Sequence, residues 1–400
     1  ILRFSATLSQ RQPRSGCMAL RTVPLLPLLC SLLLGAGALR LSAGEDRGSS
    51  DSLQGHDGLQ IRYPQGRAPV DPSVLQAVYV ACGATSCGRG LEAVRSFLAQ
   101  ALLDGGARPV LHVFVDEDCA ARVDNLRKLE PQLAEAAHLQ TYIVSELKLS
   151  TQLNLYKQCA SLRLSLPRLL PDLPKVLYMD TDTYVAGSLQ SLWKIDPYLW
   201  AFAENDLSWY GGGARCPHDW RKHLPEEYRE LQSCRYGEAG LNSGVMLLNQ
   251  DTWRRLDMDR EVNYWVNELT DNGTKPKVLL MGDQDIFNIL ASAHAKDNYT
   301  TVLPCETNSI YLNRLMCFYG QGDWVSFSRS FPENPTTAAA LQPNGKQPVI
   351  VHSKFNVNGK GQKIFVDLRK ALLKAVDKVS RGEAHGARSL CEVAGGCDMS

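Results

Sequence analysis

Two aspartates one residue apart, Asp180 and Asp182, follow the apolar run KVLYM and precede a second apolar stretch that contains Tyr184 and Val185. In an extended chain, side chains at positions i and i+2 lie on the same side of the backbone. Two carboxylates held together at the end of a buried strand repel each other unless a proton or a cation neutralises them. Oxygen ligands of this kind suit a hard divalent ion. The stretch therefore predicts a divalent-metal site, with solvated loop aspartates as the alternative.

Three further D-x-D pairs occur in the chain, so this spacing alone does not select the first pair. Asp257 and Asp259 lie in a polar helical stretch, where carboxylates favour the first turn of the helix. Asp116 and Asp118 end an apolar strand but run directly into a helix, which favours a capping role over a ligand contact. The flanks of each pair, rather than its spacing, indicate its function.

Polar residues also stand at the ends of two other apolar segments. Asp283, Gln284 and Asp285 separate an apolar run from a helical pattern, where capping alone predicts one acid rather than two. Acceptors clustered there would suit recognition of a sugar and stabilisation of positive charge at a reacting carbon. Asn242 and Ser243 are expected immediately ahead of a buried strand. They could approach a sugar hydroxyl, although a tight turn explains them equally well.

His352 follows the strand-like run PVIV and is followed by Lys354, Lys360 and Lys363 among glycines and asparagines. A single histidine after a strand is commonly structural. Beside several lysines, and in a chain that already carries paired acids, it predicts an Asp-Asp-His metal site facing a bound diphosphate. Lysine and metal together neutralise phosphate oxygens when a leaving group departs.

The elements that would position these residues alternate between strand and helix. Strands are expected at 77–83, at 109–115 and near QTYIV, with helices at 90–105 and from about 120 to 137. A further helix containing YKQCASLRLSLPRLL leads to KVLYM. This alternation predicts a Rossmann-like α/β fold, in which a mostly parallel sheet carries helices on both faces and ligands bind at the carboxyl ends of its strands.

The N-terminal part of the chain predicts export. Residues 22–39 form an uncharged stretch after Arg21 that is typical of a signal sequence, and small residues at Ala36 and Ala38 leave cleavage open. By composition the chain divides into an upstream extension at 1–17, a signal-anchor or signal peptide at 18–42, a flexible stem at 43–72, a folded domain at 73–380 and a tail with a disulfide at 381–400.

Cysteine usage agrees with an exported chain. Of 12 cysteines, an even number follows the signal segment, which favours disulfides. Close neighbours are the natural pairs, although sequence does not fix connectivity: Cys216 with Cys234, Cys305 with Cys317, and Cys391 with Cys397. N-glycosylation sequons at Asn272 and Asn298 fit the same compartment. A net charge of +1 gives no general attraction to nucleic acid.

Four motifs carry a family resemblance: CASLRLSLP (159–167), LYMDTDTYVAGSLQSLWK (177–194), GLNSGVMLLN (240–249) and GDQDIFNIL (282–290). Together, and in this order, they resemble glycosyltransferase family 8, whose members are retaining enzymes of the GT-A fold, and within it the glucoside xylosyltransferases. The resemblance covers about residues 77–370 and implies one catalytic domain. With the N-terminal segment it implies single-pass type II membrane topology in the lumen of the endoplasmic reticulum or Golgi, secretion being the alternative.

The resemblance also implies a cofactor and a donor. Asp180, Asp182 and His352 would ligate Mn²⁺ bridging the phosphates of a UDP-sugar, with Thr181 between the two acids at the same site. The other implied site residues are Ala81, Cys82 and Gly83 at the uridine, Arg163 against the donor, Asn242 and Ser243 at the donor sugar, and Asp283, Gln284 and Asp285 around the anomeric carbon and the acceptor. Retaining members are understood to react on the front face of the sugar, where the departing phosphate oxygen takes the acceptor proton.

One departure from the family pattern concerns the last motif. The family commonly reads H-x-x-G-x-x-K, whereas Phe355 and Asn358 stand at those positions after His352. The lysine that binds the diphosphate is therefore open between Lys354 and Lys360. The implied reaction moves xylose from UDP-xylose to O-linked glucose on epidermal-growth-factor-like repeats. Transfer of glucose or galactose to another acceptor, and a non-catalytic carbohydrate-binding relative, are the alternatives.

Overall fold

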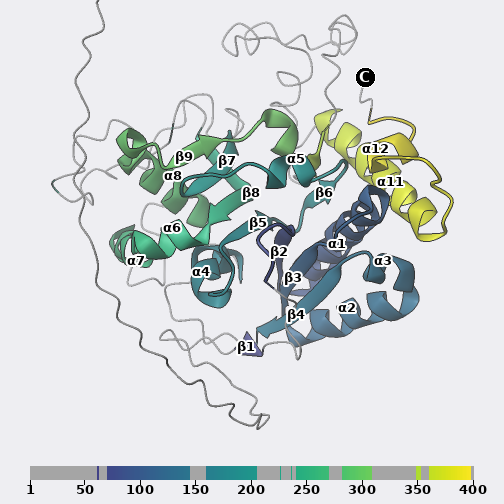
Figure 1. Ribbon diagram of the computed structural model, residues 1–400, viewed down its shortest axis with the longest axis horizontal. Helices are drawn as coiled ribbons and strands as arrows, with labels where there is room; N and C mark the ends of the chain where they lie inside the picture. Colours follow the sequence, from purple (N-terminus) through teal and green to yellow (C-terminus); the bar gives the residue numbers. More distant parts are fainter. Residues whose placement is uncertain are drawn as a thin grey trace, which may run out of the picture. The chain divides into compact units, whose positions relative to one another are not determined.

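Figure 1 shows a central sheet with helices packed against it. The computed structural model describes residues 61–62, 70–144, 159–204, 226, 236, 240–269, 282–308, 348–352 and 360–397. Within these residues the main sheet has eight strands in the order β1-β4-β3-β2-β5-β8-β7-β9. Their bounds are β1 Ile61–Arg62, β2 Gln76–Ala81, β3 Val110–Val115, β4 His138–Val144, β5 Lys175–Met179, β7 Trp200–Glu204, β8 Leu241–Asn249 and β9 Thr300–Val302.

The centre of the sheet is parallel, as the alternation of strands and helices predicts. β2 pairs in parallel with β3 and with β5, and β3 pairs in parallel with β4. β2 and β3 are buried along their whole length. This burial on both faces explains why their sequences, QAVYVA and VLHVFV, are nearly continuous apolar runs rather than alternating ones.

β8 departs from the expected arrangement, because it runs antiparallel to both of its neighbours, β5 and β7. Apolar periodicity predicts that a strand exists but does not report its direction. Asn242 and Ser243 also lie inside β8 rather than ahead of it. The antiparallel direction brings the first residues of β8 to the sheet edge at which β5 ends.

Helices cover both faces of the sheet, as predicted. One apolar cluster joins one face to α1 (Ala84–Asp104), α2 (Glu117–Leu129), α3 (Pro131–Glu135), α5 (Gln190–Trp193), α11 (Lys360–Ser380) and α12 (Leu390–Val393). A second cluster joins the other face to η2 (Ala160–Ser165), α4 (Leu166–Leu169), α6 (Gln250–Arg255), α7 (Met258–Leu269) and α8 (Asp283–Ala293). α1 lies alongside α11 (Figure 1).

Two expected helices are broken. The helical stretch from 120 to 137 divides into α2 and α3 at Glu130, because the residue before a proline is disfavoured in helical conformation and Pro131 follows. The helix expected around YKQCASLRLSLPRLL is, over its described residues, a 3₁₀ helix followed by the single turn of α4. Cys159 before it is left-handed, with φ 66°, and is bonded to Cys82.

A separate two-stranded sheet joins distant parts of the chain. β6 (Thr183–Val185) pairs antiparallel with β10 (Ile350–His352), and the register places Thr183 opposite His352. β6 begins directly after Asp182. This pairing carries His352 to the loop that follows β5.

Three disulfides lie within the described part of the chain: Cys82–Cys159, Cys87–Cys119 and Cys391–Cys397. The last confirms a predicted pair. Several predicted features lie outside the described residues: the signal segment, Cys216, Cys234, Cys317, Asn272 and Lys354. Ile61 and Arg62, from the expected stem, form β1 and pair with β4. Among the residues described, no helix is long and apolar enough to cross a membrane.

Candidate active site

The Asp-Asp-His set predicted from sequence comes together at one edge of the sheet. Asp180 follows β5, Asp182 precedes β6, and His352 ends β10. Each residue offers one ligand atom, and these atoms lie within 4.8 Å of one another. His352 Nε2 is 3.1 Å from Asp182 Oδ1. Two carboxylates and an imidazole are a donor set suited to a divalent ion such as Mn²⁺, so the residues present fit the metal that the resemblance implies.

The loop that carries the two aspartates is held by its own backbone. Asp180 N donates to Gly244 O at 2.8 Å, which fastens the end of β5 to β8. Thr183 donates to Asp180 O through both its N–H, at 3.1 Å, and its hydroxyl, at 2.7 Å. Thr181 and the two carboxylates stay partly exposed. The loop is therefore fixed, and both carboxylates keep part of their surface accessible.

Arg163, from η2, links two acidic positions. Its Nη1 donates to Asp180 Oδ1 at 3.1 Å and to Ser243 O at 2.8 Å, and its Nε pairs with Asp283 Oδ2. The Tyr178 hydroxyl donates to the same Asp180 oxygen at 2.7 Å. Arg163 is 7% exposed. It was expected against the donor, and in this structure it compensates the charge of a metal-site carboxylate and of a buried acid.

Asp283 begins α8 and is 1% exposed. Burial raises the pKa of Asp283 to about 6; Arg163 opposes this rise and the negative charge of Asp180 adds to it. The cost of desolvating a carboxylate thus outweighs the attraction of a single guanidinium. Asp283 is thus a buried carboxyl whose pKa is raised toward neutral pH.

Gln284, Asn242 and Ser243 hold the elements of the site together. Ser243 N donates to Gln284 Oε1 at 3.2 Å, which ties β8 to α8. Asn242 Oδ1 accepts from Gly244 N and from Asn308 Nδ2, both at 2.9 Å. All three side chains are nearly inaccessible, whereas the neighbouring Asp285 is partly exposed.

The residues expected at the uridine lie at the end of β2. Ala81 and Cys82 are buried, and Cys82 is in a disulfide, so Gly83 is the most accessible of the three. Asp116 accepts from Gly83 N at 2.5 Å and caps α2 by accepting from Cys119 N at 2.9 Å. The capping role predicted for Asp116 is confirmed.

The structure also describes Lys360 and Asn298. Lys360 is the first residue of α11, which follows β10 in the chain. Asn298 is exposed in a left-handed turn with φ 55°, so its side chain is accessible to glycosylation.

Sequence reasoning missed three residues of the site. Tyr178 could have been found, because it stands two positions before Asp180 near the end of β5, and side chains two positions apart in an extended chain face the same side. Gly244 leaves no room for a side chain, since a Cβ there would lie inside contact distance of the His352 ring. Asn308, in the 3₁₀ helix η7 (Cys305–Asn308), accepts at His352 Nδ1 over 3.0 Å. No periodic pattern marks such a residue.

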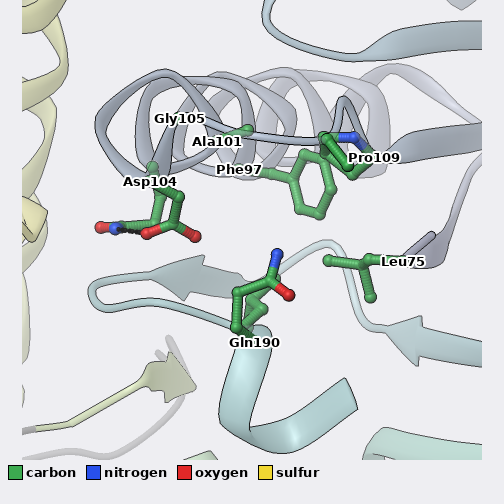
Figure 2. A pocket seen from close by; sticks show the side chains of 10 residues that line it. Leu75, Phe97, Ala101, Asp104, Gly105, Pro109 and Gln190 are labelled. Atoms are coloured by element: carbon green, nitrogen blue, oxygen red, sulfur yellow. Dashed lines mark hydrogen bonds between the residues drawn. The ribbon is translucent and has the colours of Figure 1, made fainter. Parts of the chain in front are cut away.

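A small cavity lies at the opposite edge of the sheet. Figure 2 shows Phe97, Leu75 and Gln190 around it, with Pro109 at its rim. Leu75 precedes β2 and Pro109 precedes β3, so this is the amino-terminal edge of the parallel strands. The cavity volume is about 10 Å³, room for about one water molecule. It is distinct from the candidate site and too small for a sugar.

The chain belongs to glycosyl transferase family 8, whose family model it matches over residues 87–336. It is 28% identical to glucoside xylosyltransferase 2 of Xenopus laevis, over 68% of this chain and 66% of that protein. It is 27% identical to glucoside xylosyltransferase 1 of Mus musculus, over 66% of this chain and 62% of that protein. The chain thus spans somewhat less than two thirds of the length of these curated relatives.

Two solved structures are also similar. Mouse xyloside xylosyltransferase 1 in its apo form has a TM-score of 0.44 and 17% identity, over 72% of this chain and 99% of that chain. The galactosyltransferase LgtC in complex with donor and acceptor sugar analogs has a TM-score of 0.45 and 18% identity, over 74% of this chain and 96% of that chain.

Proposed function

We propose that this protein is a retaining glycosyltransferase that transfers xylose from UDP-xylose to O-linked glucose on epidermal-growth-factor-like repeats. Membership of family 8 supplies the reaction class. Relatives named glucoside xylosyltransferase support the donor and the acceptor. The observation that carries the proposal is the Asp180, Asp182 and His352 cluster, which lies beside the buried carboxyl of Asp283.

Asp180, Asp182 and His352 would hold Mn²⁺, which when bound supplies positive charge against the diphosphate of the donor. Arg163 orients Asp180 through the bond to its Oδ1, and Tyr178 donates to the same oxygen. Asp180 Oδ1 accepts from both groups, which fixes the plane of the carboxylate. The chain therefore presets the orientation of this carboxylate before a donor binds.

Asp283 stabilises positive charge that develops at the anomeric carbon as the bond to phosphate breaks. Its pairing with Arg163 keeps it fixed on α8, and burial keeps water from screening it. The acceptor proton passes to the departing phosphate oxygen, so no side chain is required to form a bond to the sugar. Lys354 or Lys360 would neutralise the diphosphate.

The same proposal places the enzyme in the lumen of the endoplasmic reticulum or Golgi, as a single-pass type II membrane protein. The uncharged segment at 22–39 supports this placement, as do the disulfides and the exposed sequon at Asn298. UDP-sugars and glycoprotein acceptors meet in that compartment.

The test is turnover of UDP-sugars by the purified protein. We expect Mn²⁺-dependent hydrolysis of UDP-xylose to exceed that of UDP-glucose and UDP-galactose, and transfer of xylose to a peptide carrying O-linked glucose. Asp182→Asn should abolish both, because it removes an anionic ligand. Asp118→Asn, at an exposed acid in the first turn of α2, is the matched control and should leave both unchanged. Absence of turnover with every UDP-sugar, together with no effect of Mn²⁺ on UDP binding, would sink the enzyme proposal.

A further inference from the structure

A chain of three hydrogen bonds runs from the backbone of β8 to the imidazole of His352. Gly244 N donates to Asn242 Oδ1 at 2.9 Å, and Asn308 Nδ2 donates to the same oxygen at 2.9 Å. Asn308 Oδ1 then lies 3.0 Å from His352 Nδ1. Asn242 and Asn308 are 1% exposed and His352 is 3% exposed. These three hydrogen bonds are therefore shielded from water, and each polar group in them must find its partner within the protein.

The direction of every bond in this chain follows from its first member. A backbone N–H is only a donor, so Asn242 must turn its oxygen to Gly244. That oxygen also faces Asn308, which must present its amide NH₂ group there. The oxygen of Asn308 is thereby left for His352, and an oxygen acceptor beside Nδ1 requires Nδ1 to carry the hydrogen. The Gly244 N–H thus determines, through the side chains of Asn242 and Asn308, that His352 Nδ1 carries a hydrogen.

The other ring nitrogen faces the acid pair. With the hydrogen on Nδ1, a neutral His352 has a lone pair at Nε2, which lies 3.1 Å from Asp182 Oδ1. A lone pair and a carboxylate oxygen repel each other at this distance unless a proton or a metal cation lies between them. The arrangement thus matches a metal ligand, whose second nitrogen is held by a hydrogen-bond acceptor.

We propose that Asn308 is a positioning residue of the metal site: it keeps the hydrogen of His352 on Nδ1 and so directs the Nε2 lone pair at the cation. This inference rests on the metal site of the proposed function. Asn242 and Gly244 act through Asn308 by fixing the orientation of its amide. The neutral histidine side chain in water favours the hydrogen on Nε2, so the protein must supply the opposite preference.

Two substitutions of Asn308 separate this role from a purely structural one. Asn308→Leu has a similar volume and removes both bonds. Asn308→Asp also loses the donor to Asn242 but keeps an oxygen acceptor for His352 Nδ1. A structural role predicts that both variants behave alike, whereas a positioning role predicts that Asp rescues metal binding. Asn249→Leu is the control: Asn249 caps α6 at the far end of β8, so its loss destabilises the fold without contact to His352.

The first measurement is Mn²⁺ affinity with UDP present, from the signal of free Mn²⁺ in electron paramagnetic resonance. Asn308→Leu should bind Mn²⁺ about 10- to 100-fold more weakly, and Asn308→Asp should return to within about fivefold of the unsubstituted protein. Asn249→Leu should bind Mn²⁺ normally. Equal affinity in Asn308→Leu and the unsubstituted protein, or equal weakness in both Asn308 variants, would overturn the inference.

The second measurement needs no metal. In ¹⁵N-histidine protein, two-bond ¹H–¹⁵N correlations report which ring nitrogen carries hydrogen, and His352→Gln identifies the signals of His352. We expect hydrogen on Nδ1 in the unsubstituted protein and its transfer to Nε2, facing Asp182, in Asn308→Leu. An Nδ1 without hydrogen in the unsubstituted protein would refute the inference. If that protein instead shows the expected tautomer but binds no Mn²⁺, the proposed function and the metal-positioning role fail, and only the control of the His352 tautomer by Asn308 stands.

Discussion

At the scale of single residues, Arg163 compensates the negative charges of two neighbouring acids, Asp180 and Asp283. It pairs with Asp283 and donates to Asp180, and its side chain is 8% exposed. A second arginine, Arg95, also joins two acids, Glu130 and Asp377, but its side chain is 22% exposed. The two arginines form a matched pair that differs mainly in burial.

We expect Arg163→Met to lower the free energy of unfolding by about 3–5 kcal/mol, because it leaves a buried carboxylate without its partner. Arg95→Met should cost about 1 kcal/mol, since water screens its partners. Urea unfolding of the two variants measures the difference. Adding Asp283→Asn to Arg163→Met should restore part of the loss. Equal costs for the two arginines would contradict this account of Arg163.

The metal-site residues show what local sequence can and cannot predict. Asp180 and Asp182 stand out because their charges interrupt two apolar stretches, and His352 because it ends a third. Asn308 carries no such signal, since its bonds to Asn242 and His352 join residues far apart in sequence. Such bonds depend on the tertiary arrangement of β8, η7 and β10, which no periodicity encodes.

At the scale of elements, the fold could be predicted where strands and helices alternate along the chain. The direction of an individual strand could not be predicted. The parallel strands β2, β3 and β5 follow from short apolar runs separated by helices. The antiparallel direction of β8 does not follow from such a pattern, because an apolar run gives no information about the direction in which a strand pairs. That direction places Asn242 and Gly244 next to Asp180, so part of the site depends on a feature absent from the local pattern.

The disulfides differ in the length of the loop that each one closes. Cys82–Cys159 spans 77 residues and ties the end of β2 to the start of η2, whereas Cys391–Cys397 spans 6 residues. On the loop-entropy relation, the first stabilises the fold by about 4.5 kcal/mol and the second by about 2.2 kcal/mol. We expect the Cys82→Ser/Cys159→Ser variant to melt at a lower temperature than Cys391→Ser/Cys397→Ser. The opposite order in calorimetry would show that loop closure is not the main contribution.

At the scale of the whole molecule, the free energy of unfolding should decrease at acidic pH because of a buried histidine in the sheet. His112 in β3 is 3% exposed and lies 2.8 Å from the Tyr142 hydroxyl and 3.0 Å from Gln76 Oε1. Burial lowers the pKa of His112 to about 3, from an ordinary value of 6.5. The native state therefore disfavours the charged imidazole that the unfolded chain acquires below neutral pH.

The sign follows from this lowered pKa. The contribution of His112 is fully present above pH 6.5 and is lost as the pH falls toward 3, at about 1.4 kcal/mol per pH unit. Between pH 7 and 5, the unsubstituted protein should thus lose about 2 kcal/mol more stability than His112→Gln. Urea unfolding of both proteins at the two pH values tests this. Parallel pH dependence would show that His112 does not titrate in this way.

The pairing of β6 with β10 gives the metal site an order of assembly. His352 follows Asp182 by 170 residues and reaches it only when β10 docks on β6. During synthesis on the ribosome, a growing chain holds both aspartates, and the strands before them, long before the histidine exists. Any product interrupted in that interval keeps β2, β3 and β5 but has an acid pair without its third ligand. The three candidate ligands therefore come together only after the chain has been made beyond residue 352 and β10 has paired with β6.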